Sequence, residues 1–244
     1  MALGAAQIGT YRDREWKQAY GYMNSCNLTG ITVTQKTIAG VMVRIRGEAG
    51  NSLDSLHGTS IETAITDIVA AHHALPTLDF YLTSSQNVPN VAMKTYTAGA
   101  PAPIIFLGPK MWTKNPALPG TGAAVTGGIG SSGPRGVANQ AYDGTARFFG
   151  NPKQKAQGAT IVIHELGHIL HEIHNPGVFW EEQQAIEGQN PSPNAPGWSG
   201  QATNVSHYAS NNQLEFVAEV FTGQMIGCNY AGAVTAAYTA LGGP

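Results

Sequence analysis

Alternating apolar and polar positions mark one strand near the start of the chain. Between residues 38 and 46, Val41, Val43 and Ile45 alternate with a methionine and two arginines. This period of two predicts a strand over 38–46 with one buried face. Two shorter apolar runs, bounded by Pro and Gly, predict strands over 79–83 and 104–107.

Other stretches follow a helical period. A short polar helix is expected within 11–28. A second is expected over 61–75, with Thr59 or Ser60 as its N-terminal cap and Pro76 at its end. The remaining elements are a buried helix over 161–174, a capped helix over 211–221, a short strand over 145–149, and Gly/Pro-rich loops over 116–136 and 189–200. With these strands and helices we expect an α+β fold.

The helix over 161–174 carries two histidines and a glutamate among apolar residues. His164 and His168 are four residues apart, so their imidazoles share one helix face. Such a pair can bind one Zn²⁺, and Glu165 beside it can reach a metal-bound water. This is the H-E-x-x-H pattern of zinc metalloproteases. A buried helix rarely carries such a group without a partner, so we interpret it as a zinc site.

Composition and charge narrow the class of partner. Charged residues make up only 11% of the 244 residues, against about 25% in typical domains, and the formal net charge is −2. No strong field attracts nucleic acid or anionic membrane, and no window approaches the ~18 apolar residues of a membrane span. We expect neither partner. The low charged fraction is typical of exported proteins, although no signal peptide is recognisable in residues 1–10.

Two other features suggest no further cofactor. Cys26 and Cys228 form either one disulfide or two buried thiols, and their spacing is not that of a zinc or redox motif. The G-x-G-x-x-G run at 128–133 is followed by Pro134 instead of a helix, so it does not predict a nucleotide site.

A catalytic zinc needs a third protein ligand, and two candidates follow the motif closely. His174 fits the metzincin pattern H-E-x-x-H-x-x-G-x-x-H, except that His171 stands where that pattern has Gly. Glu187 lies at a spacing close to that of thermolysin-like enzymes, but no helix continues beyond it.

The third candidate, Glu215, lies in the helix over 211–221, one turn from Glu219 on the same face. One carboxylate on the metal and another on the free N–H of a ligating histidine is an arrangement that metals favour. Tyr208 lies in a polar turn just before this helix, where its phenol could donate to an oxyanion. For neighbouring His207, support of a ligand, contact with substrate and a surface position are equal alternatives.

These residues resemble a known family. His164-Glu165-Leu166-Gly167-His168, followed by Y-x₆-E-x-x-A-E-x-F from Tyr208 to Phe221, is similar to the catalytic domain of anthrax lethal factor and related bacterial peptidases. The resemblance covers residues 160–222, and residues 1–150 carry no signature. It implies His164, His168 and Glu215 as zinc ligands, Glu165 as general base, Tyr208 as oxyanion donor and Glu219 as support for a ligand. The extra histidines, His171 and His174, keep the metzincin alternative open.

The resemblance also implies a zincin-like, two-lobed metallopeptidase in one domain over 1–244. The N-terminal lobe, 1–174, would hold a mixed sheet and the active-site helix. The C-terminal lobe, 175–244, would be mainly helical and supply the third ligand.

We therefore expect a zinc endopeptidase that uses a Glu-activated, zinc-bound water, and a monomeric, secreted toxin or effector. A protein or peptide substrate would pair with an edge strand, for which 145–149 is the candidate. An inhibitor or immunity protein is a further candidate partner. The alternatives are a metzincin with His174 as ligand, a zinc hydrolase with a non-peptide substrate, and an inactive binding domain with structural zinc.

Overall fold

A computed structural model of the chain describes residues 3–25, 32–47, 56–82, 93–97, 102–107, 157–188, 197–206 and 208–244. The predicted loop over 116–136, the predicted strand over 145–149, the Gly-rich run at 128–133, Cys26 and His207 lie outside these residues. Within the described residues, no helix is both long and apolar enough to cross a membrane.

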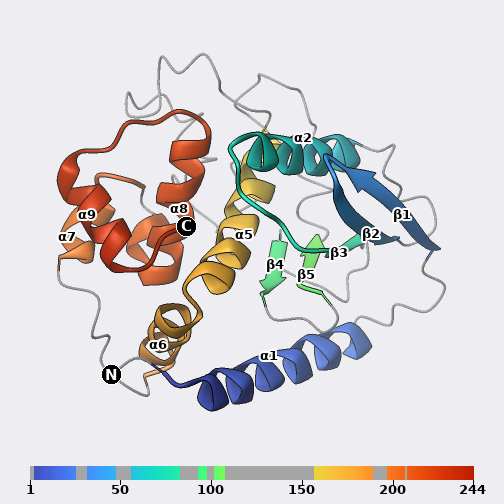
Figure 1. Ribbon diagram of the computed structural model, residues 1–244, viewed down its shortest axis with the longest axis horizontal. Helices are drawn as coiled ribbons and strands as arrows, with labels where there is room; N and C mark the ends of the chain where they lie inside the picture. Colours follow the sequence, from blue (N-terminus) through green and yellow to red (C-terminus); the bar gives the residue numbers. More distant parts are fainter. Residues whose placement is uncertain are drawn as a thin grey trace.

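Five strands of the described residues form a mixed sheet in one part of the fold (Figure 1). Its order is β1-β2-β3-β5-β4, with β2, β3 and β5 parallel and the two outer strands antiparallel to their neighbours. The strands are β1 (Thr32–Ile38), β2 (Val41–Gly47), β3 (Leu78–Leu82), β4 (Met93–Tyr96) and β5 (Ile104–Leu107).

The predicted strand over 38–46 begins in the wrong place, because Ile38 ends β1 and a hairpin turn separates it from β2. Ala39 and Gly40 form this turn, both with positive φ (48° and 86°), as two-residue hairpins require. The strands predicted over 79–83 and 104–107 correspond to β3 and β5. β1 and β4 were not predicted, since neither carries a regular apolar alternation.

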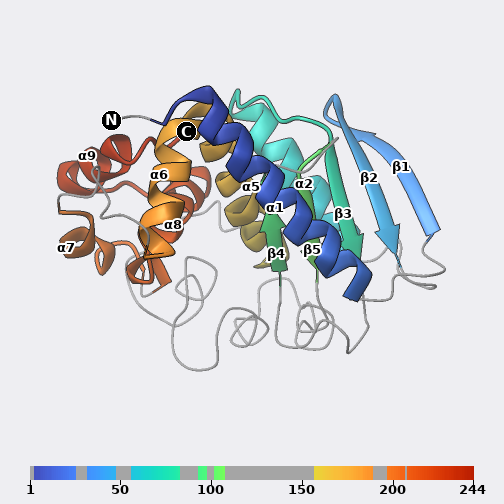
Figure 2. The same ribbon diagram turned by 90° about the horizontal axis from the view of Figure 1, so that it is seen from below.

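Helices cover both faces of the sheet (Figure 2). One face packs against α2 (Leu56–Ala70) and α5 (Gln157–His174) through a core that includes Val43, Phe80 and Ile105. The other packs against α1 (Ala5–Ser25), where Trp16 and Ala19 meet aromatic side chains of β3, β4 and β5. Successive side chains of β3 and β5 point to opposite faces of the sheet, so these strands contribute to the core on each face.

Two helices differ from the prediction. α1 begins at Ala5 and is much longer than the short helix expected within 11–28. α2 lies about five residues earlier than 61–75, so Ser60 is a buried residue inside the helix and not its cap. A positive φ of 68° at His72 turns the chain well before Pro76.

The rest of the described chain is helical and lies on the other side of α5 from the sheet (Figure 1). It comprises α6 (Pro176–Ile186), α7 (Trp198–Ala202), the 3₁₀ turn η1 (Tyr208–Ser210), α8 (Gln213–Met225) and α9 (Gly232–Ala240). α7 overlaps the loop predicted over 189–200. The fold is α+β, as expected, and α5 lies between its sheet and the C-terminal helices.

Candidate metal centre

The core fixes the orientation of α5. Ile163, Leu166, Ile169 and Leu170 are fully buried against α2, the sheet and α8. The remaining face presents His164 and His168 one above the other, with ring centroids 5.0 Å apart. The helix ends at His174, next to Asn175 and Pro176, as the sequence predicted.

α8 brings Glu215 to this face. Its N-terminal cap is Asn212, whose side-chain oxygen accepts a hydrogen bond from the backbone N–H of Glu215 at 2.9 Å. α8 approaches α5 closely because Gly167 has no side chain: a Cβ there would lie 2.9 Å from Cδ1 of Phe221. A cap and a glycine thus place the first turn of α8 beside the two histidines.

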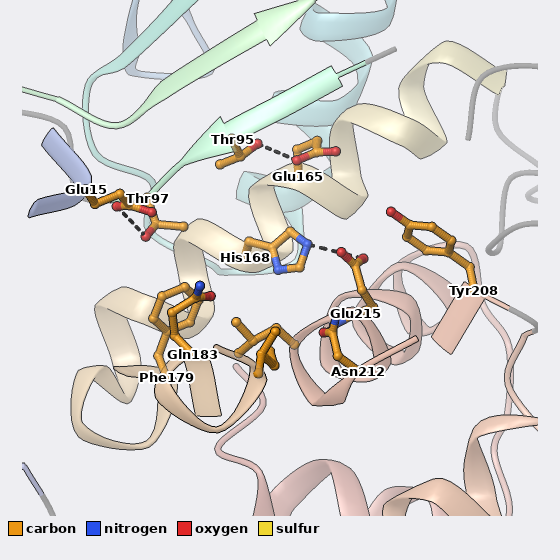
Figure 3. A pocket seen from close by; sticks show the side chains of 12 residues that line it. Glu15, Thr95, Thr97, Glu165, His168, Phe179, Gln183, Tyr208, Asn212 and Glu215 are labelled. Atoms are coloured by element: carbon orange, nitrogen blue, oxygen red, sulfur yellow. Dashed lines mark hydrogen bonds and ion pairs between the residues drawn. The ribbon is translucent and has the colours of Figure 1, made fainter. Parts of the chain in front are cut away.

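Ligand atoms of His164, His168 and Glu215 converge at this crossing, and Figure 3 shows His168 and Glu215 pointing toward each other. Oε2 of Glu215 lies 3.0 Å from Nε2 of His164 and 3.6 Å from Nε2 of His168. The ligand atoms of the three residues all lie within 4.8 Å of one another, and His164 is buried. Two imidazoles and one carboxylate form a known ligand set of catalytic metal sites, so this group could hold a metal ion.

The charges of the group suit a cation. Burial alone would raise the pKa of Glu215, but hydrogen bonds to His164 and His168 outweigh it and hold that pKa well below its ordinary value. The carboxylate is therefore an anion, the state in which it binds metals. Glu219 extends the arrangement outward: its Oε1 lies 2.7 Å from Nδ1 of His164, and its side chain is buried. This contact orients the ring so that Nε2 faces Glu215.

Glu165 and Tyr208 face the same cavity (Figure 3). Thr95 of β4 donates its hydroxyl hydrogen to Oε2 of Glu165. Tyr208, in η1, has its ring centroid 5.8 Å from that of His164. Burial, and then the negative charge of Glu215, raises the pKa of Tyr208 far above its ordinary value. Its phenol therefore keeps its proton and can donate a hydrogen bond.

The cavity has a volume of about 350 Å³ and is lined by residues from both sides of α5. The sequence did not predict Glu15 of α1 or Thr95 of β4 as part of the site, because neither residue belongs to a motif. Its lining residues are Glu15, Thr95, Thr97, Glu165, His168, Phe179, Gln183, Ile186, Tyr208, Asn212, Leu214 and Glu215.

The two other ligand candidates lie elsewhere. His174 is exposed at the end of α5 and stacks on His73, with ring centroids 6.3 Å apart. Glu187 follows α6, and its Oε2 pairs with Nη2 of Arg14 at 2.9 Å. Within the described residues, neither belongs to a group that could hold a metal. Cys228 is a half-buried thiol whose pKa burial raises to about 12.

His171 is fully buried in α5, with its ring edge-on to Phe179. Burial, and then the charge of nearby His168, lowers the pKa of His171 from 6.5 to about 3. As the pH falls, His171 of the unfolded chain binds a proton near pH 6.5, whereas His171 of the folded protein binds one only near pH 3. The contribution of neutral, buried His171 to the free energy of unfolding is therefore complete above pH 6.5 and is lost as the pH falls towards 3.

We therefore expect protonation of His171 to lower the free energy of unfolding by about 1.4 kcal/mol for each unit by which the pH decreases in this range. His171→Leu should remove that part of the slope between pH 6 and pH 4, whereas exposed His72→Gln should keep it. Urea unfolding of chelator-treated protein at each pH measures the difference. An unchanged slope in His171→Leu would show that another group causes the acid sensitivity.

Comparison with known proteins finds no matching family model, no matching curated protein and no matching solved structure.

Proposed function

We propose that the chain is a zinc-dependent endopeptidase with a zincin-like, two-lobed arrangement about the cavity. One observation carries the proposal: His164, His168 and Glu215 converge from two helices, and Glu165 and Tyr208 face the same cavity. A structural zinc usually has four protein ligands, often cysteines. Three ligands beside an acid and a phenol are instead typical of a hydrolytic site.

The residues of the chain divide the reaction between them. Zn²⁺, when held by His164, His168 and Glu215, would polarise the scissile carbonyl and acidify a water molecule. The Glu165 carboxylate accepts the proton of the attacking water and passes it to the nitrogen of the departing amine. The hydroxyl of Tyr208 donates a hydrogen bond to the carbonyl oxygen as negative charge develops on it.

A strand beside the cavity favours an extended peptide as the substrate. Among the described strands, β4 lies at an edge of the sheet and pairs with β5, and Thr95 of β4 and Thr97 just after it line the cavity. A peptide can add to such an edge as a further strand. The sequence offered 145–149 for this role; that segment lies outside the described residues, and β4 is a second candidate. The low charged fraction and the resemblance to bacterial peptidases support an exported toxin or effector. In this proposal the protein acts as a monomer, and an inhibitor or immunity protein binds it.

Metal removal tests this proposal directly. We expect purified protein to contain about one zinc per chain and to cleave members of a peptide library. A strong chelator should abolish cleavage, and one equivalent of Zn²⁺ should restore it. Metal analysis and mass spectrometry of the digested library measure both quantities. Undiminished cleavage by metal-free protein would contradict the proposal.

A further inference from the structure

Glu219 has one carboxylate oxygen that the contacts of the metal centre leave unused. Its Oε1 lies 2.7 Å from Nδ1 of His164, whereas its Oε2 is buried and has no hydrogen-bond partner among the described residues. A buried carboxylate oxygen without a donor is costly, because it has lost its hydration and gained no bond in return. A donor near this oxygen would stabilise the carboxylate and also fix the position in which it meets His164.

The chain that follows α8 turns back onto the face of the helix that carries Glu219. α8 ends in a turn around Gly227, where φ is 89° and the backbone N–H of Cys228 donates to the carbonyl of Gly223 at 2.8 Å. The turn lays the ring of Tyr230 over Gly223, where a Cβ would collide with the phenol oxygen and lie 2.6 Å from Cζ. Gly223 comes one helical turn after Glu219, so both lie on the same face of α8.

The phenol of Tyr230 is a second polar group that lacks a partner in this region. Its oxygen is buried and makes no hydrogen bond within the part of the chain that the structure describes. The phenol has a hydrogen to donate, whereas an ionised carboxylate can only accept, so Tyr230 and Glu219 are complementary. Burial, and then interaction with Cys228 and Glu219, raises the pKa of Tyr230 well above its ordinary value. The phenol therefore keeps the proton that it would donate.

The thiol of Cys228 is the other polar group beside this phenol, in a small cluster with Ile226. Thiol sulfur is a weak acceptor, whereas hydrogen bonds to an ionised carboxylate are roughly twice as strong as those between neutral groups. The phenol of Tyr230 therefore favours Glu219 over Cys228. Loss of the thiol would alter the packing around the ring and leave the bond to Glu219 in place.

We propose that Tyr230 is a positioning residue of the metal centre, a role that rests on the zinc site of the proposed function. Its hydroxyl donates a hydrogen bond to Oε2 of Glu219, directly or through one bound water, and so holds Glu219 against Nδ1 of His164. Gly223 makes room for the ring. Tyr230 is not among the described residues that line the cavity, so it acts through Glu219 and not on the substrate.

The zinc affinity of Tyr230→Phe tests the proposal, because this variant loses the hydroxyl and keeps the ring. We expect the Kd for zinc to rise roughly 2- to 10-fold, the range for one net hydrogen bond. Cys228→Ala and Tyr238→Phe are the controls and should keep the wild-type Kd, since the hydroxyl of Tyr238 donates to the carbonyl of Pro244 instead. Competition with a chromophoric chelator measures Kd, and thermal unfolding shows that each variant is folded.

A double-mutant cycle shows whether Tyr230 acts through Glu219. Glu219→Met has a similar volume but no carboxylate, and it should raise the Kd for zinc by roughly 10- to 100-fold. Adding Tyr230→Phe to Glu219→Met should raise Kd no further. The ¹⁵N resonance of Nδ1 of His164 in zinc-loaded protein is a second readout. It should shift in Tyr230→Phe and stay in place in Cys228→Ala.

The outcomes separate this inference from the proposed function. A wild-type Kd in Tyr230→Phe, or a loss of affinity that persists in the Glu219→Met background, overturns the positioning role alone. An equal loss in Cys228→Ala would assign the effect to packing around the ring and also overturn it. Zinc binding without any peptide cleavage would refute the peptidase and leave the role of Tyr230 standing. Failure of the wild type to bind zinc would refute both.

Discussion

Replacing Glu165 by Gln should abolish peptide cleavage and leave the zinc content unchanged. The amide can accept no proton from water, and general acid–base catalysis of this kind contributes about 10²–10⁴-fold to the rate. Glu165 is not one of the three converging ligands, so its substitution removes no bond to the metal. The amide oxygen can still accept the hydrogen bond of Thr95, which keeps the side chain in place.

Zinc content and kcat/KM of the same preparation are the measurements. Glu62→Gln is the control, because Glu62 pairs with Lys36 and is not among the residues that line the cavity. Full activity of Glu165→Gln would exclude this residue as the general base. Loss of zinc together with activity would mean that Glu165 serves the metal site itself. If even the wild type proved inactive with its zinc in place, the binding-domain alternative would stand.

The parts of the site that could be predicted are those encoded by residues close in sequence. The spacing of His164 and His168 places two imidazoles on one face of any helix that contains them. The polar residues at the start of the helix expected over 211–221 predict a cap, and the structure identifies it as Asn212. The relation of Glu215 to Glu219 also follows from helical spacing. Each of these inferences needs one helix only.

The parts that could not be predicted depend on packing between distant segments. β4 has four residues and no apolar alternation, so only its pairing with β5 defines it as a strand. Glu15 comes to the cavity because α1 packs across the sheet, more than 140 positions before the motif in the chain. Composition and periodicity carry no record of such contacts. Gly167 is likewise an unremarkable residue of the motif until Phe221 is seen against it.

The identity of the third ligand has the second large expected effect. Glu215→Ala should weaken zinc binding by more than the 10- to 100-fold that loss of a residue behind a ligand costs. His174→Ala should bind zinc as the wild type does, because His174 is exposed and stacks on His73 away from the group. Glu219→Gln should fall between them, since it contacts Nδ1 of His164 and not the metal position.

Competition with a chromophoric chelator measures the three affinities, and circular dichroism confirms that each variant is folded. The order Glu215→Ala, Glu219→Gln, His174→Ala, from weakest to strongest binding, distinguishes a ligand, its support and a bystander. The metzincin alternative predicts the opposite result for two of these variants: His174→Ala would lose zinc and Glu215→Ala would keep it. That result would make His174 the third ligand. The backbone at the end of α5 would then have to reverse its direction for His174 to reach the position between His164 and His168.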